Sequence, residues 1–154
     1  MTKVIRIYAD TSVFGGVFDD EFSDTSTLFF QQVRSGRFIL VTSEVVNQEL
    51  SSAPSQVKHF FDDILPYTEI TDITIEALKL QKAYIKEGIV SENFLSDALH
   101  VALSTVSSCD GIVSWNFKHI VHFKKIPLYN AVNVLHGYNT IFIHSPLEVV
   151  SYED

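Results

Sequence analysis

The chain has 154 residues, of which 46% are hydrophobic and 19% are charged. These values are typical of a folded chain rather than a disordered one, and we expect residues 1–154 to form a single domain. No stretch approaches the roughly 18 consecutive apolar residues of a membrane span, and residues 1–6 lack the pattern of a signal peptide. The only cysteine, Cys109, cannot form an internal disulfide. We therefore expect a cytoplasmic location and no membrane partner.

The formal net charge of −8 argues at first against a nucleic-acid partner. The charge is unevenly distributed, however, because residues 1–110 hold 16 acids and 8 bases, whereas residues 111–147 hold no Asp or Glu. The acid-free stretch carries four histidines and three lysines, Lys118, Lys124 and Lys125. Such asymmetry indicates either an anionic partner or a solvated face, and charge alone does not choose between them.

The first half of the chain alternates apolar runs with turn signals. We expect a strand, a helix, a strand and two helices over residues 4–9, 24–35, 38–42, 43–50 and 55–63. The pair Gly15-Gly16 is expected to break regular structure after the first strand. Gly36 is a typical helix stop, and Ser43 is a typical N-cap.

The second half continues the alternation. We expect a helix, a helix, a strand, a helix and a strand over residues 72–87, 97–107, 111–114, 129–135 and 141–144. Strands that alternate with helices imply right-handed crossovers and a mostly parallel sheet covered on both faces. The predicted fold is therefore three-layer α/β/α.

Asp10 directly follows the first predicted strand. Ligands of open α/β sheets bind beyond the carboxyl ends of the strands, so Asp10 is a candidate site residue, with Ser12 in a supporting position. The alternative is that Asp10 only forms a turn or caps a helix.

Glu49 is expected on the apolar face of the helix over residues 43–50. It follows Val45 by four residues and Val46 by three, which places the three side chains on one face. A glutamate on a buried face is costly unless it is paired or binds a metal ion. The alternative is a glutamate at the rim of the apolar face that reaches solvent.

Asp97 opens an otherwise apolar helix and shares a face with Val101. It is therefore a third candidate, although an aspartate in a first helical turn also complements the helix dipole. His100 lies three residues further on, and we interpret it as a hydrogen-bonded core residue outside the site.

The segment from Gly111 to Asn116 places polar residues at the end of a predicted strand. Ser114 and Asn116 could orient a water molecule or a phosphate, or they could simply form a strand-end turn. We interpret Trp115 as a packing residue or a platform at the rim, and Asp110-Gly111 as a turn.

If Asp10, Glu49 and Asp97 converge, they require protons or a cation. Two like charges about 4 Å apart repel by roughly 4 kcal/mol at an effective dielectric constant of 20. An all-oxygen set favours Mg²⁺ or Mn²⁺ over zinc, and no Cys/His pattern with zinc spacing occurs. Such an ion is well suited to phosphodiester cleavage.

Four segments in this order resemble the motifs of the PIN-domain family, and in particular its VapC-type toxin ribonucleases. They are residues 10–12 (DTS), 42–50 (TSEVVNQEL), 96–102 (SDALHVA) and 112–116 (IVSWN). The resemblance implies a PIN-like fold and cleavage of single-stranded RNA with Mg²⁺ or Mn²⁺. It also implies a homodimer and a small protein antitoxin.

By the same resemblance, Asp10, Glu49 and Asp97 would be the metal ligands, and Asn116 would complete the catalytic set with Ser12 and Ser114 in support. Many family members have aspartate at the position of Asn116, so the number of metal ions stays open. Lys118, Lys124 and Lys125 become candidates for contacts with RNA phosphates.

Two other functions compete with a ribonuclease. An aspartyl-phosphate phosphatase also starts with an aspartate after a first strand, but it usually has a second aspartate two residues later, where this chain has Ser12. A catalytically weak or inactive PIN-like module that binds RNA or protein is the other alternative, and Asn116 keeps it open. RNA cleavage in Mg²⁺ or Mn²⁺ that a chelator stops would separate the ribonuclease from the inactive module.

Overall fold

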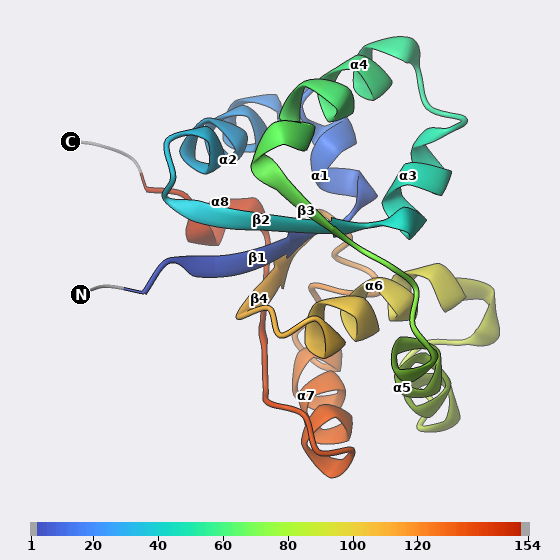
Figure 1. Cartoon of the computed structure of the whole chain (residues 1–154). Coiled ribbons are helices and arrows are strands. Elements are labelled where there is room, and N and C mark those ends of the chain that lie inside the picture. The colour runs from blue at the N-terminus through green and yellow to red at the C-terminus, as the bar shows by residue number, and fades with distance from the viewer. Residues whose placement is uncertain (1–2, 152–154) are drawn as a thin grey trace.

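Five parallel strands form one sheet at the centre of the computed structural model, which describes residues 3–151 (Figure 1). The strands are β1 (Ile5–Ala9), β2 (Phe38–Ser43), β3 (Thr68–Thr71), β4 (Gly111–Val113) and β5 (Phe142–His144). Their order across the sheet is β3-β2-β1-β4-β5, and every neighbouring pair is parallel. All five strands therefore end at the same edge, and the sequence prediction of a mostly parallel sheet is confirmed.

Helices cover both faces of the sheet (Figure 1). One face carries α1 (Thr11–Gly16), α2 (Ser23–Arg34), α3 (Glu44–Leu50), α4 (Ser55–Ile64) and α8 (Pro146–Val149). The other face carries α5 (Ile75–Lys86), α6 (Leu95–Val106) and α7 (Lys125–Leu135). Two short 3₁₀ helices, η1 (Leu65–Tyr67) and η2 (Glu92–Phe94), lie between the longer elements. This is the predicted three-layer α/β/α arrangement.

The alternation of side chains along β1 divides the core in two. Ile7 and Ala9 are buried in the cluster on the α1–α4 side, whereas Tyr8 is buried among the residues of the α5–α7 side. Successive residues of a strand point to opposite faces, so a central strand must be apolar on both. The turn after α2 depends on Gly36, whose φ of +84° is strained for any residue with a Cβ atom.

Several elements differ from the sequence predictions, among them α8 (Pro146–Val149), where no helix was predicted. The strand β3 was not predicted, because its edge position leaves Glu69 and Ile70 exposed and removes the apolar signal of the inner strands. The predicted break at Gly15-Gly16 is wrong, since both glycines belong to the last turn of α1. The helix α7 begins at Lys125, four residues before the predicted start, because Pro127 is tolerated in a first helical turn.

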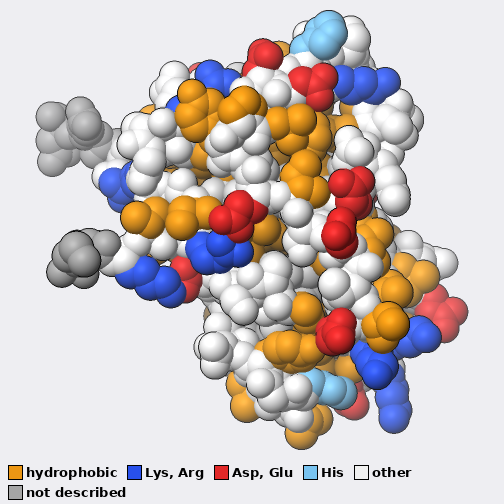
Figure 2. All heavy atoms as spheres, viewed as in Figure 1, with side chains coloured by type: hydrophobic (Ala, Val, Ile, Leu, Met, Phe, Trp, Pro, Cys, Tyr) orange, Lys and Arg blue, Asp and Glu red, His pale blue; other side chains and the backbone are white. Residues whose placement is uncertain are grey.

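One face of the molecule shows no single patch of like charge. On the face that Figure 2 shows, Lys and Arg side chains lie scattered among acidic ones rather than in one patch. Within residues 3–151, no helix is long and apolar enough to cross a membrane.

Candidate active site

The carboxyl ends of the two central strands bring Asp10 and Ser114 together. Ala9 pairs with Val113 in the last register position of β1 and β4, and the next residue of each strand is Asp10 and Ser114, respectively. The Ser114 hydroxyl donates a hydrogen bond of 2.6 Å to Oδ2 of Asp10. Residues that are 104 positions apart in sequence thus meet where ligands of parallel sheets bind.

Asp10 is almost fully buried, at 4% exposure, and each of its carboxylate oxygens accepts hydrogen bonds. Oδ1 accepts from the Ser12 hydroxyl at 2.6 Å and from the Ser12 amide at 3.1 Å, so Asp10 also caps α1. Burial raises the pKa of Asp10 above its ordinary value, against the lowering by His100 and by the two serine hydroxyls, and the charge of Asp97 adds a smaller rise. The carboxylate is held in one orientation but is poorly compensated in charge.

The two serine hydroxyls are themselves fixed by the backbone. Ser12 Oγ accepts a hydrogen bond of 2.9 Å from the Trp115 amide, and Ser114 Oγ accepts one of 2.9 Å from the Asn116 amide. Each hydroxyl must therefore direct its proton toward Asp10. Both serines thus orient Asp10, and their supporting role in a functional site stays a prediction.

Glu49 reaches the same edge of the sheet from α3. Val45 and Val46 are buried as expected, but the Glu49 side chain is 36% exposed and lies at the rim of that face. Its Oε1 accepts hydrogen bonds from the Thr11 hydroxyl at 2.9 Å and from His100 Nε2 at 2.6 Å. Burial alone would raise the pKa of Glu49, but the hydrogen bonds from His100 and Thr11 hold it below its ordinary value.

His100 connects this glutamate to the core. Its side chain is buried, as predicted, with Nδ1 2.7 Å from the Tyr8 hydroxyl and Nε2 against Glu49. The Tyr8 hydroxyl is also 2.7 Å from Ser43 Oγ, so Ser43 occupies the N-cap position of α3 without capping it through its side chain. Since a carboxylate only accepts, Nε2 of His100 carries the proton of the hydrogen bond to Glu49.

Asp97 lies in the first turn of α6, where it is half-buried beside Asn116. The Oδ1 atom of Asn116 accepts hydrogen bonds from the backbone amides of Lys118 at 3.2 Å and His119 at 2.9 Å. The amide nitrogen is therefore the end that donates to Asp97. Burial raises the pKa of Asp97 above its ordinary value, and the negative charge of Glu49 adds to the rise, against the lowering by Asn116.

The three predicted acids are linked by effects on one another's pKa, but they do not together surround one position. The pKa of Asp10 responds to Asp97, and that of Asp97 responds to Glu49. Among residues 3–151, however, no group of three or more Asp, Glu, His or Cys side chains is placed to enclose a metal ion. Asp10 and Asp97 fit a hard divalent cation, because their oxygens are partly desolvated and repel each other. Glu49 is instead turned toward His100.

The three candidate lysines differ in exposure and in their contacts. Lys118 and Lys124 are exposed, whereas Nζ of Lys125 donates a hydrogen bond of 2.5 Å to the backbone oxygen of Ile89. Of these three lysines, Lys118 is the nearest in sequence to Asn116, which it follows by two residues. Lys125 is engaged in holding the start of α7 against the segment after α5.

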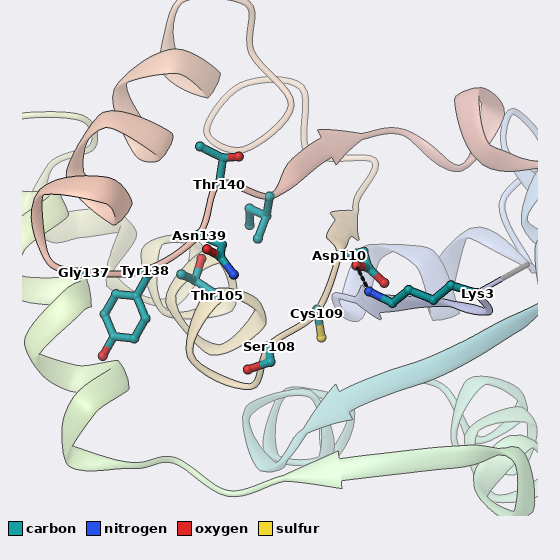
Figure 3. A pocket seen from close by; sticks show the side chains of 10 residues that line it. Lys3, Thr105, Ser108, Cys109, Asp110, Gly137, Tyr138, Asn139 and Thr140 are labelled. Carbon is teal, nitrogen blue, oxygen red and sulfur yellow. Dashed lines mark hydrogen bonds and ion pairs between the residues drawn. The ribbon is translucent and has the colours of Figure 1, made fainter.

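A pocket of about 470 Å³ lies at the opposite edge of the sheet, where Asp110 precedes β4 (Figure 3). The carboxylate of Asp110 accepts hydrogen bonds of 2.8 Å from Lys3 Nζ and from the Arg6 amide, which agrees with the predicted strand-start turn. Cys109 lines the same pocket, but burial raises the pKa of its thiol to about 11, so the thiol is protonated at neutral pH. This pocket contains none of the candidate site residues.

Asn116→Asp tests whether Asn116 borders a cation site. The carboxylate oxygen that replaces Nδ2 would face Asp97, so the site would gain one negative charge. We expect Mn²⁺ to bind about tenfold more tightly, or about 1.4 kcal/mol, because repulsion and desolvation offset most of the gross attraction. Calorimetric titration with Mn²⁺ measures the change.

The matched control is Asn139→Asp, which adds the same charge at an exposed position in the pocket at the opposite edge. Equal Mn²⁺ affinities of Asn116→Asp and the wild type would place Asn116 outside any metal site. The metal-free Asn116→Asp protein should also melt at a lower temperature, because a new carboxylate adjoins Asp97.

Comparison with known proteins identifies relatives in structure but not in sequence. No known sequence family matches this chain, and no curated protein matches it in sequence. One similar solved structure is VapBC2 from Rickettsia felis bound to a promoter DNA fragment, with 18% identity, a TM-score of 0.58, and coverage of 80% of this chain and 94% of the other.

Two further structures agree with the first. A toxin–antitoxin complex from Klebsiella pneumoniae has 14% identity and a TM-score of 0.58, covering 77% of this chain and 93% of the other. VapC20 of Mycobacterium tuberculosis, a toxin that cleaves the Sarcin-Ricin loop, has 14% identity and a TM-score of 0.57, covering 73% and 92%, respectively. At identities this low, the structural similarity shows a shared fold and nothing more. The expected PIN-like fold is thereby confirmed.

Proposed function

We propose that this chain is a metal-dependent endoribonuclease that cleaves single-stranded RNA and acts as the toxin of a type II toxin–antitoxin pair. The observation that supports this most is the pair of desolvated carboxylates, Asp10 and Asp97, in a fold shared with three toxin structures. Both lie at the edge of the sheet where ligands of parallel sheets bind.

The cofactor that we propose is Mg²⁺ or Mn²⁺, since the candidate ligands are oxygens only. When bound, such an ion supplies Lewis acidity toward a phosphate group. Asp10 and Asp97 would hold it, with Glu49 at the rim of the site.

The surrounding residues fix the orientation of these acids before any substrate arrives. Ser12 and Ser114 direct their protons to the two oxygens of Asp10, and Asn116 donates to Asp97. His100 Nε2 keeps a proton in its hydrogen bond to Glu49. Preorganised dipoles of this kind reduce the reorganisation that a reaction requires.

A catalytically weak or inactive PIN-like module that binds RNA or protein is the second candidate. It is favoured by the neutral side chain of Asn116 and by the lack of a three-residue metal cage among residues 3–151. The two candidates predict the same fold and the same binding surface, so only an activity measurement separates them.

The test is incubation of the purified chain with a labelled, unstructured RNA in Mg²⁺ or Mn²⁺, with and without a chelator. The proposed nuclease should produce discrete fragments that disappear with chelator and return when the ion is restored. Binding without cleavage in either ion would support the module instead. Purification of Asp10→Asn by the same route controls for contaminating nucleases.

Partners are proposed from the same structural neighbours. Since one neighbour is a toxin–antitoxin complex, we expect a small protein antitoxin and, by the PIN-domain resemblance, a homodimer. Induced expression in a bacterial host should arrest growth, and co-expression of the proposed small antitoxin should restore it. Light scattering during gel filtration measures the oligomeric state.

Reversal of Lys118 tests whether the acid-free stretch contacts RNA. In Lys118→Glu, we expect weaker binding to single-stranded RNA of any sequence, and a slope of log affinity against log salt that is shallower by about 0.7 for one lost phosphate contact. Filter binding in chelator measures both. The matched control is Arg37→Glu, an exposed position just before β2 at the opposite edge of the sheet. Equal slopes for the two variants would make Lys118 part of a solvated face.

A further inference from the structure

Three aromatic side chains cluster beside the candidate acids. Trp115 stacks on Phe22 with ring centroids 4.2 Å apart and planes inclined by 17°. The ring of Phe117 lies 6.1 Å from that of Trp115 and 6.5 Å from that of Phe22. We call these three residues the aromatic platform. Packing explains Trp115, but it does not explain Phe117, which is 49% exposed.

The platform is rigid at its base. Trp115 Nε1 donates a hydrogen bond of 2.9 Å to Ser26 Oγ in α2, and the indole packs against Gly16 so closely that a Cβ atom there would lie 2.9 Å from Nε1. The Trp115 amide is held by Ser12 Oγ. The base of the platform and the hydroxyl that orients Asp10 are therefore parts of one hydrogen-bonded unit.

The platform is also connected in sequence to the residues that hold Asp10 and Asp97. Ser114, Trp115, Asn116 and Phe117 are consecutive, so residues that hold Asp10 and Asp97 alternate with residues of the platform. A phosphodiester placed at the acids would bring a neighbouring base within reach of Phe117. Lys118 follows directly, exposed and in the stretch without acids, which complements a phosphate backbone.

We propose that Phe117, supported by the Trp115–Phe22 stack, is the subsite on which an unpaired base of the RNA substrate stacks next to the cleaved phosphodiester. The inference rests on the proposed function and specifies how that function recognises a single strand. An exposed aromatic face beside a lysine is the usual means of holding unpaired bases without reading their sequence. A duplex cannot present a free base face, so the platform selects single-stranded RNA.

The test uses the fact that Trp115 is the only tryptophan of the chain. In chelator, titration with a fluorescein-labelled single-stranded RNA of mixed sequence should change the Trp115 emission and raise the anisotropy of the label. Phe117→Ala should weaken binding about tenfold, the loss expected for one stacked base. Phe117→Trp should restore the affinity measured by anisotropy, whereas Phe117→Leu, which is apolar but not flat, should not.

The matched control is Tyr67→Ala, which removes a 50% exposed aromatic ring just before β3, at the opposite edge of the sheet. It should bind RNA like the wild type. Because Phe117 is half-exposed, Phe117→Ala should keep the melting temperature of the wild type, which circular dichroism checks.

Three outcomes would overturn the platform. The first is that Phe117→Ala binds RNA with the affinity of the wild type, and the second is that Phe117→Leu does so. The third is that Phe117→Ala binds RNA normally but is no longer neutralised by the antitoxin, which would assign the surface to a protein partner. The proposed function is tested separately, because a wild-type chain that cleaves RNA while Phe117→Ala retains its KM refutes only the platform. A wild-type chain that neither binds nor cleaves RNA refutes both.

Discussion

Asp97→Asn is expected to lower the rate of RNA cleavage by about a hundred- to a thousandfold while leaving the fold intact. The change removes one charge from a half-buried position that the Asn116 amide supports. Loss of a carboxylate that holds a divalent ion removes several kcal/mol of charge stabilisation at the phosphate, which corresponds to about this factor. Single-turnover cleavage of a labelled RNA measures the rate.

A stability measurement separates this explanation from misfolding. The pKa of Asp97 in the folded chain is raised above its ordinary value. An acid of this kind destabilises the fold when it is ionised, so the contribution of Asp97 to the stability of the metal-free wild type should rise as the pH falls from neutral through the raised pKa toward the ordinary one. In Asp97→Asn, the stability should therefore increase less, or fall more, at low pH than it does in the wild type, because the contribution of Asp97 is missing.

In chelator at neutral pH, Asp97→Asn should therefore melt at the same temperature as the wild type or a higher one. The control is Asp20→Asn, an exposed acid in the loop between α1 and α2, which should keep both the wild-type rate and its pH dependence of melting. Full cleavage by repurified Asp97→Asn would remove Asp97 from the site. A large fall in its melting temperature would show that its role is structural.

The parts of the fold that could be predicted from sequence are those whose signal is local. The strands β1, β2 and β4 are rich in apolar residues because most of their side chains are buried on both faces, although β1 includes Arg6 and β2 ends in Thr42-Ser43. The helices α2 and α5 are each followed by a glycine with positive φ. The edge strand β3 has no such signal, because its burial is incomplete. The fold was thus predictable even though one of its strands was not.

In the candidate site, too, some contacts could be predicted from sequence and others could not. The proximity of Asp10 to Ser114 follows from parallel neighbouring strands, which sequence alternation already indicates. The contact between Glu49 and His100 joins α3 to α6, and no local pattern reports such a pair. One signal was present, since His100 follows Asp97 by three residues and so shares its side of the helix. The catalytic roles of these residues stay predictions.

His100→Ala is expected to lower cleavage by about ten- to a hundredfold, the usual effect of removing a group that orients a metal ligand. The physical reason is that Glu49 Oε1 loses its shortest hydrogen bond, 2.6 Å to Nε2, and the carboxylate keeps those from Thr11 and Ser96. Since the side chain of Glu49 is 36% exposed, it would then be free to turn toward solvent. His100→Gln should recover part of the activity, because its amide can still donate to Glu49.

Tyr8→Phe provides the matched comparison, because it removes the other hydrogen bond of the same ring. The variant leaves Nδ1 of His100 without the Tyr8 hydroxyl but keeps Nε2 against Glu49. An unpaired buried polar atom costs about 1–3 kcal/mol, so Tyr8→Phe and His100→Ala should both unfold at lower denaturant concentrations. Only His100→Ala should lose most of its cleavage rate, with the loss in kcat rather than in KM. If the rates of both variants instead fall in proportion to their stabilities, His100 is a structural residue of the core, as its burial alone would suggest, and Glu49 does not depend on it.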